Sequence, residues 1–352
     1  MKLRYKPVIL ILAVLFLQLF LIAGSGGEIV EANNNSQIEV QDTADVEIDD
    51  NLIDQQGEVT IVIRLSEASK SLNDQGLSSP DIEQLRDHAE STQANVEQFA
   101  NDHAGIDIEN QFWLTNAVVA TVDTETITLD QLALIKGVEK IHADFEVEAE
   151  SASASVSPSL SSDTVSTEED TTYGLDQINA SEAWSQYNTR GEGVKVAVLD
   201  TGVDAAHDDI DLYTDDSTDP TYPGGWAEFD SSGDQVAGSE PHDTDTHGTH
   251  VSGTVAGGNA AGTYIGVAPE TNLMHGLVMP DNGGSFSQII GGMEWAVEND
   301  ADVISMSLGA DGYYSSFIDP IRTAESQGVV VIASIGNDGE GTSSSPGNEY
   351  DS

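Results

Sequence analysis

Two short, nearly continuous apolar runs constrain the fold of this chain more than any other feature of its sequence. Val194 to Leu199 leads directly to Asp200, and Val329 to Ala333 leads through a short polar stretch to Asn337. Apolar runs of this length without alternation are typical of strands buried on both faces of a parallel sheet. Because a segment with helical periodicity, Ile289 to Glu298, lies between them, the second half of the chain is predicted to be α/β with a parallel sheet.

The first half of the chain has a different pattern. Residues 57–65 alternate between polar and apolar side chains, as a half-buried strand does. Further segments follow in the order α, β, β, α, β, at residues 81–104, within 111–122, at 129–135 and at 138–147. The long helix carries an apolar stripe made of Ile82, Leu85, Ala89, Val96 and Phe99. The complete order β-α-β-β-α-β predicts a small ferredoxin-like α+β sandwich.

Composition divides the chain into five segments. They are a leader at residues 1–25, an acidic spacer at 26–56, the small sandwich at 57–150, a Ser-rich acidic linker at 151–171 and the α/β domain at 172–352. The leader has a basic start, an apolar stretch and then small residues, which is the order of a secretory signal peptide. A permanent membrane anchor is the alternative, but the apolar stretch is slightly short for a span and Gln18 interrupts it.

No Arg-Arg pair is present in the leader, so we expect a Sec-type signal and an extracellular protein. Contact with a membrane is then expected only through the leader, before it is cleaved. With no cysteine in the sequence, the stability of the folded chain has to come from core burial, salt or bound cations.

The charge balance excludes several classes of partner. The chain has 62 Asp and Glu residues against 11 Lys and Arg residues, a formal net charge of -51. Such a surface repels nucleic acid and anionic lipid, so neither is an expected partner. Acidity of this degree can also indicate disorder, but the Gly- and Val-rich patterned segments argue against that interpretation. We therefore expect a folded protein whose repulsion is screened by concentrated salt, as in proteins of halophiles.

Four short motifs in the second half carry the candidate chemistry. In chain order they are Val196 to Val203 with Asp200, Asp245 to Thr254 with His247, Ile304 to Gly309, and Val330 to Gly339 with Asn337. A strand that ends at Asp200 places this acid where catalytic groups gather in parallel sheets, although the residue alone is equally typical of a loop cap. His247 and His250 also suggest a metal pair, but neither an HExxH motif nor an obvious third ligand accompanies them.

Together and in this order, the motifs resemble those of the subtilisin-like serine proteases, the subtilase family. The resemblance covers residues 172–352 and implies a three-layer parallel-sheet catalytic domain, here incomplete, that hydrolyses protein or peptide substrates. It implies that His247 is the base of an Asp-His-Ser triad, that Asp200 orients it, and that Asn337 donates in the oxyanion hole. It also implies that an extended substrate is clamped by the backbone at Gly283, Gly284, Ser307, Leu308 and Gly309.

The small sandwich resembles the inhibitor I9-type propeptide of the same family, with matches around residues 61–65, 116–122 and 137–147. In that family the propeptide assists folding of the catalytic domain and blocks its cleft. The resemblance therefore implies that the chain's own propeptide is an intramolecular inhibitor, with Phe145 to Glu150 lying in the cleft.

The nucleophile of the family is missing from this sequence. In the family it lies in a Gly-Thr-Ser-Met-Ala-like helix start, several tens of residues after the oxyanion Asn, whereas this sequence ends 15 residues after Asn337. Gly341 to Pro346 contains a similar Gly-Thr-Ser, but no helical pattern follows it, so we reject Ser343 as the nucleophile. The chain is expected to be C-terminally truncated and inactive as given.

No catalytic cofactor is expected, but calcium stabilises many members of the family. Asp209 matches a family ligand, and loop 258–264 matches the ligand loop in length, although Ala260 stands where the family usually has Asn. Asn259 and Glu169 are further candidate ligands. The alternative is that these residues are solvated acidic surface.

The sequence is compatible with three functions. The first is a secreted endopeptidase zymogen. The second is a truncated, catalytically dead product whose propeptide inhibits an intact relative. The third is a salt-adapted surface protein, which leaves the context of Asp200, His247 and Asn337 unexplained. Downstream genomic sequence separates the first two, because a continuing frame with the nucleophile motif favours the zymogen and a stop codon favours the inhibitor.

Overall fold

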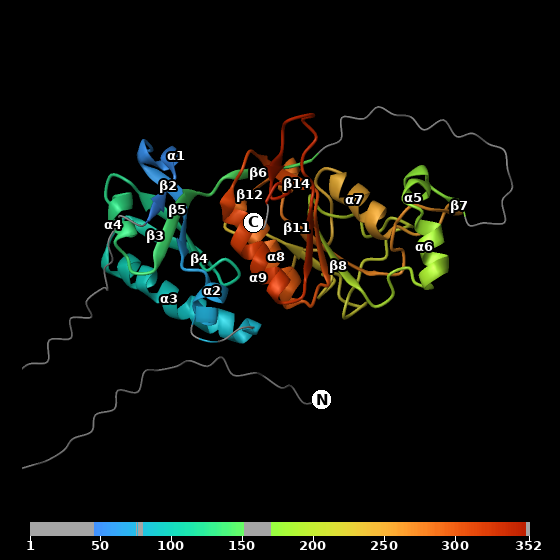
Figure 1. Ribbon diagram of the computed structural model, residues 1–352, viewed down its shortest axis with the longest axis horizontal. Helices are drawn as coiled ribbons and strands as arrows, with labels where there is room; N and C mark the ends of the chain where they lie inside the picture. Colours follow the sequence, from blue (N-terminus) through green and yellow to red (C-terminus); the bar gives the residue numbers. More distant parts are fainter. Residues whose placement is uncertain (1–45, 75, 77–79, 151–169, 350–352) are drawn as a thin grey trace, which may run out of the picture. The chain divides into compact units, whose positions relative to one another are not determined.

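The computed structural model describes residues 46–74, 76, 80–150 and 170–349 (Figure 1). The predicted leader and most of the predicted linker lie outside these residues. The chain divides into Met1–Gln37, which falls wholly outside the described residues, and Ile38–Ser352, which contains all the elements below. Among the described residues, no helix combines the length and the apolar character needed to cross a membrane.

The N-terminal part of this unit is a five-stranded sheet with the order β1-β5-β2-β4-β3. Its strands are β1 (Glu47–Ile48), β2 (Glu58–Leu65), β3 (Ile106–Phe112), β4 (Ala117–Asp123) and β5 (Val138–Ala143). Its helices are α1 (Asp50–Ile53), α2 (Ala68–Asp74), α3 (Ile82–Asp102) and α4 (Leu129–Ala133). Strand β2 is antiparallel to both β4 and β5, and β3 is antiparallel to β4. Apart from β1, this is the topology of the ferredoxin-like sandwich that the sequence predicts.

Helix α3 forms where its sequence pattern predicts a helix. The Asp81 side chain accepts a hydrogen bond from the Gln84 backbone while the Gln84 side chain reaches back to the Asp81 backbone, so a capping box fixes the first turn. Four of the five predicted stripe residues are buried, namely Leu85, Ala89, Val96 and Phe99. Ile82 is only partly buried, because it stands in the first turn of the helix.

Two expectations for this half are wrong. The predicted spacer at 26–56 contains β1 and α1, and Leu52 within it is 2% exposed. These elements form because β1 pairs with the edge strand β5 and Leu52 joins the core beneath it, contacts that lie far away in sequence.

The second wrong expectation is a continuous strand over 138–147. The structure has two strands here, β5 and β6 (Glu146–Ala149), and β6 belongs to another sheet. The break lies at Asp144 and Phe145, which turn toward a helix of the second half. Phe286 N donates to Phe145 O at 3.0 Å, and Ser287 N donates to Asp144 Oδ1 at 3.0 Å. These contacts supply acceptors for the otherwise unpaired N–H groups of a helix start.

The second half is built on a parallel sheet with the order β15-β13-β8-β11-β9. The strands are β8 (Lys195–Asp200), β9 (Trp226–Glu228), β11 (Asn272–Leu277), β13 (Val303–Met306) and β15 (Val330–Ala333). The helices that pack on it are α7 (His247–Ala256), α8 (Phe286–Glu298) and α9 (Ile318–Ser326). The remaining elements are β7 (Asp170–Thr171), α5 (Tyr173–Gln177), α6 (Ala180–Tyr187), β10 (Thr263–Tyr264), β12 (Gly283–Ser285), β14 (Leu308–Asp311), β16 (Ser344–Ser345) and two 3-10 turns, η2 (Pro280–Asn282) and η3 (Ser315–Phe317).

Side chains that alternate along β8 divide the second half into three layers. Ala197 and Leu199 join the cluster that contains α8 and α9, whereas Val198 joins the cluster that contains α7. The sheet therefore lies between helices on both faces, and the predicted α/β fold with a parallel sheet is confirmed. Helix α8 begins three residues before the predicted start because Ser285 and Gln288 form a capping box.

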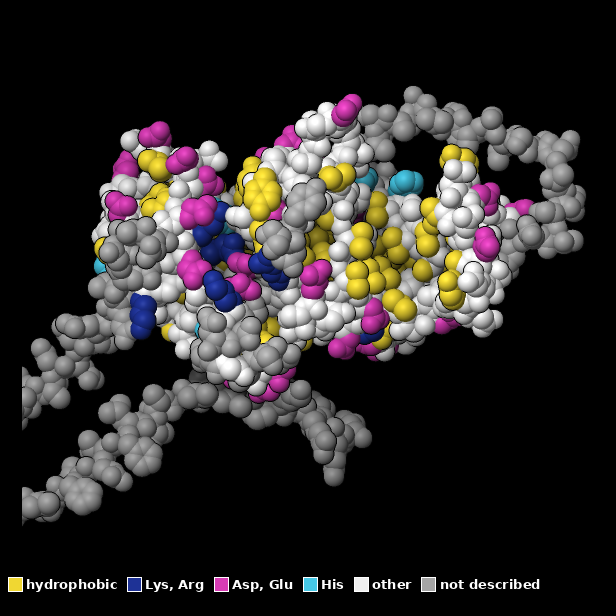
Figure 2. Space-filling view, viewed as in Figure 1, with side chains coloured by type: hydrophobic (Ala, Val, Ile, Leu, Met, Phe, Trp, Pro, Cys, Tyr) yellow, Lys and Arg dark blue, Asp and Glu magenta, His cyan; other side chains and the backbone are white. Residues whose placement is uncertain are grey.

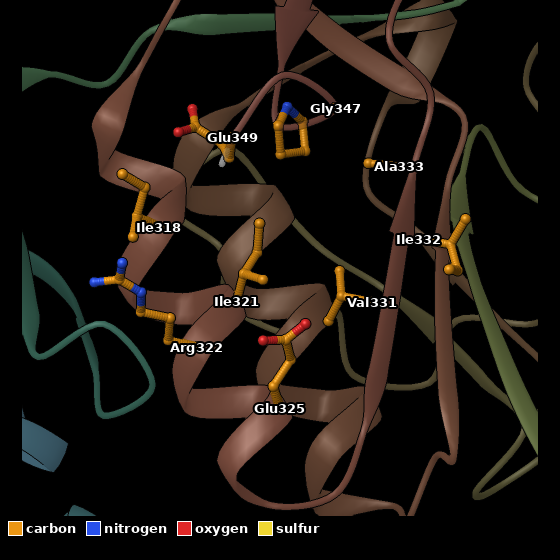
Figure 3. Close-up of a pocket in the computed structure, with 10 residues that line it drawn as sticks. Ile318, Ile321, Arg322, Glu325, Val331, Ile332, Ala333, Gly347 and Glu349 are labelled. Atoms are coloured by element: carbon orange, nitrogen blue, oxygen red, sulfur yellow. The ribbon is translucent and has the colours of Figure 1, made fainter. Parts of the chain in front are cut away.

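Strand β15 is the outermost strand of the parallel sheet among the described residues. Among the described strands β15 pairs only with β13, and its side chains alternate, with Val330 52% and Ile332 55% exposed. Hydrophobic side chains accordingly gather on this face of the second half (Figure 2). Between β15 and α9 lies a pocket of about 360 Å³, with Ile321 and Val331 on its walls and Glu349 at its rim (Figure 3).

Candidate active site

Asp200 and His247 meet at the carboxyl end of β8. Asp200 ends the strand and is fully buried, and His247 is the first residue of α7. His247 Nδ1 donates to Asp200 Oδ1 at 2.7 Å, which is within the range that the catalytic interpretation requires. Asp200 Oδ1 also accepts a hydrogen bond from Thr201 N at 2.7 Å.

This contact fixes the electrostatics of the pair. The hydrogen bond from the ring to Asp200 raises the pKa of His247, with a smaller contribution from the Glu150 backbone. Burial raises the pKa of the Asp200 carboxyl, while the hydrogen bonds from His247 and Thr201 oppose that rise. The Nδ1 proton is thus held by Asp200, which leaves Nε2 as the ring nitrogen available for proton transfer.

Asp243 organises this end of α7, and our sequence analysis missed it. Its Oδ2 accepts a hydrogen bond from Thr249 N at 2.8 Å, and its Oδ1 accepts from Thr246 N at 3.0 Å and from Thr201 Oγ1 at 2.9 Å. One carboxylate therefore caps the helix that carries His247 and holds the residue after Asp200. An acid a few residues before a helix start is a capping signal that could have identified it.

A segment of the chain itself lies across the site. Strand β6 runs antiparallel between β12 and β14, with Gly284 opposite Val147 and Gly309 opposite Glu148. Glu150 N donates to Ser307 O at 3.0 Å and extends this ladder by one residue. The five predicted clamp residues, Gly283, Gly284, Ser307, Leu308 and Gly309, all lie on the two strands or loops that flank β6.

Glycine is required at two of these positions because the backbones approach closely. A Cβ at Gly284 would lie 2.2 Å from Val278 O, and one at Gly309 would lie 2.6 Å from both Glu150 Oε1 and Ser344 Cβ. Val147 on the inserted strand is fully buried between them. Strand β6 thus lies between β12 and β14 by strand addition.

Asn337 stands at the end of the inserted strand. Its Nδ2 donates to the backbone oxygen of Glu150 at 3.1 Å. Glu150 and His247 also line one cavity of about 760 Å³, together with Ser305 and Ser307. His247 and Asn337, which are far apart in sequence, therefore both lie beside Glu150, and Asp200 holds His247 from the other side of its ring.

The remaining candidate residues lie elsewhere. The Ser343 hydroxyl accepts a hydrogen bond from Asn348 Nδ2 at 3.0 Å. Asp209 lies beside the loop predicted to bind calcium, and its Oδ1 accepts a hydrogen bond from Ala260 N at 2.6 Å. Asn259 is exposed, and Glu169 lies outside the described residues.

The described residues around Asp209 and loop 258–264 supply only part of the ligand set predicted for calcium. In residues 46–74, 76, 80–150 and 170–349, no three His, Cys, Asp or Glu side chains converge as metal ligands. The loop offers the Asp209 carboxylate and backbone oxygens, fewer side-chain oxygens than calcium sites commonly use. The His247 and His250 pair likewise has no third ligand among these residues.

Comparisons with known proteins agree with this geometry. Residues 191–351 match the model of the subtilase family. Subtilisin amylosacchariticus from Bacillus subtilis subsp. amylosacchariticus is 30% identical over 240 residues, which is 68% of this chain and 54% of that protein. An intracellular serine protease from Paenibacillus polymyxa is 37% identical over 177 residues, 48% of each protein.

A solved structure agrees on the fold. Fervidolysin from Fervidobacterium pennivorans, described as a keratinolytic enzyme related to subtilisin, matches with a TM-score of 0.55 and 20% identity. The match covers 88% of this chain and 45% of that one. The chain spans about half the length of the curated relatives it matches. Over residues 191–351, this chain is therefore similar to the subtilase family of subtilisin-like serine peptidases.

Proposed function

We propose that this chain is part of a secreted subtilisin-like serine endopeptidase that is made as a zymogen. His247 is the general base, Asp200 orients its ring and stabilises the imidazolium, and Asn337 donates to the carbonyl oxygen that gains negative charge. The observation that carries the proposal is the 3.1 Å hydrogen bond from Asn337 Nδ2 to Glu150 O, at the end of a strand held as a substrate would be. A base, an oxyanion donor and a peptide carbonyl are thereby brought together.

The proposed mechanism needs a serine nucleophile, and we do not assign that role to any serine of this sequence. A serine hydroxyl needs a neutral base beside it, and His247 Nε2 would take its proton. Ser343 is a poor candidate because its hydroxyl is paired with Asn348. We assign the nucleophile to the part of the relatives' length that this chain does not span.

Residues 57–150 act in this proposal as the inhibitory propeptide. The support is the position of β6, which fills the cleft between β12 and β14. Because Asn337 holds the carbonyl of Glu150, the peptide bond after Glu150 is the one that processing would cleave. That bond begins the Ser-rich stretch from Ser151 onward, which is an exposed type of sequence.

Secretion, salt adaptation and calcium binding belong to the same proposal. The leader sequence supports secretion through the Sec route. The excess of 62 acidic over 11 basic residues supports a saline working environment, and Asp and Glu side chains outnumber Lys and Arg on the visible face (Figure 2). Calcium at Asp209, Asn259 and Glu169 stays a prediction.

The test is to express the full reading frame that contains this sequence, in molar salt, and to treat the product with a fluorophosphonate probe. We expect covalent labelling and a new N-terminus after Glu150. Both should be lost in His247→Ala, because no base remains to activate the nucleophile. The matched control is His250→Ala, an exposed histidine one turn further along α7, which should keep both. Labelling of the His247→Ala protein would contradict the proposal.

The second candidate function is a dead protein that inhibits an intact relative. The observation in its favour is that the chain's own strand already has the geometry of a bound inhibitor. A stop codon directly after Ser352 would support it. Adding the purified chain to an active subtilisin should then slow peptide hydrolysis, and Val147→Asp, which buries a charge in β6, should abolish that effect.

A further inference from the structure

His275 lies at the centre of β11, within an otherwise largely apolar run, and is fully buried. It is paired in register with Val198 of β8, two residues before Asp200. Both ring nitrogens are hydrogen bonded. Gly202 N donates to Nε2 at 3.2 Å, and Ser252 Oγ lies 2.9 Å from Nδ1.

The partners determine the protonation state of this ring. A backbone N–H can only donate, so Nε2 of His275 is the unprotonated acceptor. The proton of the neutral imidazole is then on Nδ1, which donates to Ser252 Oγ. Burial lowers the pKa of His275 to about 3, and Asp243 is the charged group that acts on it in the opposite direction. The ring is therefore neutral in this arrangement, and both of its hydrogen bonds are directional.

The two partners come from the two halves of the candidate pair. Gly202 is two residues after Asp200, in the loop that leaves β8, and Ser252 is on α7, five residues after His247. The loop after β8, helix α7 and the His275 ring are closely packed here, since a Cβ at Gly248 would lie 2.1 Å from Gly202 O and 3.0 Å from His275 Cε1.

We propose that His275 is a positioning residue for the Asp200–His247 pair, because its neutral ring ties the loop that follows Asp200 to the helix that carries His247. This inference rests on the proposed function of that pair. Without the ring nitrogens, Gly202 N and Ser252 Oγ would be buried without partners, and both groups would move to find new ones. The loop and the helix would then no longer hold Asp200 and His247 at a fixed separation, which a general base requires.

The experiment is an NMR titration of the His247 ring in the full chain in molar salt. In the unmodified protein we expect His247 to titrate above its ordinary pKa, because of the hydrogen bond to Asp200. His275→Phe keeps an aromatic ring, slightly larger than imidazole, but removes both nitrogens, so the pKa of His247 should fall toward the ordinary value. His275→Gln should preserve the raised pKa, since its amide carries a donor and an acceptor.

Two further variants distinguish the possible failures. Met274→Ala is the matched control, because Met274 is the neighbouring, fully buried residue of β11 and packs in the cluster of α8; it should destabilise the fold without moving the His247 titration. Ser252→Ala removes one of the two hydrogen bonds of His275 and should lower the pKa of His247 by a smaller amount. This variant provides the test if His275→Phe does not fold. Asp200→Asn should lower the pKa of His247 whether or not His275 has a role.

The outcomes are separable. If His275→Phe and Ser252→Ala both leave the His247 titration unchanged while Asp200→Asn lowers it, the positioning role of His275 is overturned and the proposed pair survives. If Asp200→Asn has no effect on His247 in the unmodified background, the pair itself and the proposed function fail. A shift in His275→Phe that His275→Gln rescues, and that Met274→Ala does not reproduce, supports the inference.

Discussion

The two sheets of this chain are covered to different degrees. In the N-terminal sheet, Ile61 and Ile63 of β2 pack in a core with α3, whereas Val62 between them packs in the cluster of α8 and α9. Both faces of that sheet are therefore buried. In the parallel sheet, the edge strand β15 leaves Val330 and Ile332 more than half exposed.

This difference shows that the N-terminal sheet depends on the second half for one of its faces. Polar contacts follow the same surface, because Leu114 N donates to Glu294 Oε1 of α8 at 2.7 Å and Lys140 Nζ donates to Ser315 Oγ at 3.2 Å. Burial also raises the pKa of Glu294 to about 8. Helices α8 and α9 thus pack against both sheets.

The strongest test of this comparison is to separate the two halves within residues 151–169. We expect residues 46–150 and 170–352 each to lose cooperative unfolding when alone, because Val62 and the α8 surface are then exposed to water. Mixing them should restore near-ultraviolet circular dichroism. The N-terminal piece should retain more structure, since its core with α3 is internal to it. A mixed spectrum equal to the sum of the separate spectra would show that the halves are independent.

Salt should affect the two halves alike, because they have similar charge imbalance. Residues 57–150 contain 19 acidic and 5 basic residues, and residues 172–352 contain 30 and 3, which is nearly the same net charge per residue. We expect the full chain to lose structure in dilute buffer and regain it in molar salt, where the Debye length falls to about 3 Å. Circular dichroism across a salt series measures this. A melting temperature that does not change with salt would remove the argument for salt adaptation.

The smallest expected effects come from two ion pairs that cross between the halves. Arg64 of β2 pairs with Asp319 of α9, and both side chains are largely buried, whereas Arg86 of α3 pairs with Glu298 of α8 at the surface. Asp319→Ala removes the hydrogen-bonded carboxylate of a largely buried guanidinium and should lower the free energy of unfolding by about 3–5 kcal/mol. Glu298→Ala should lower the free energy of unfolding by about 1 kcal/mol or less.

Denaturant unfolding in molar salt measures both variants. Combining Asp319→Ala with Arg64→Met, and Glu298→Ala with Arg86→Met, gives two double-mutant cycles. Each cycle separates the interaction energy of its ion pair from the other effects of the single substitutions. Equal costs for Asp319→Ala and Glu298→Ala would mean that the covered face of the N-terminal sheet is as accessible as its rim, which contradicts the comparison.

The sequence by itself determined the elements whose signals are local. Capping residues and an apolar stripe specify α3, and the apolar run at 194–199 specifies β8. The order of four motifs predicts the similarity to the subtilase family before any contact is known. Each of these signals depends on residues within one or two turns or one strand, where periodicity and capping are strong.

Only the tertiary structure decided what depends on distant partners. The sequence pattern is continuous through 138–147, yet the chain leaves the sheet at Asp144 because α8 offers unpaired N–H groups there. His275 reads as an ordinary core residue until Gly202 and Ser252 are brought to its two nitrogens. Strand β15 reads as buried because hydrophobicity reports what a strand can bury, whereas its exposure depends on which neighbours stand beside it.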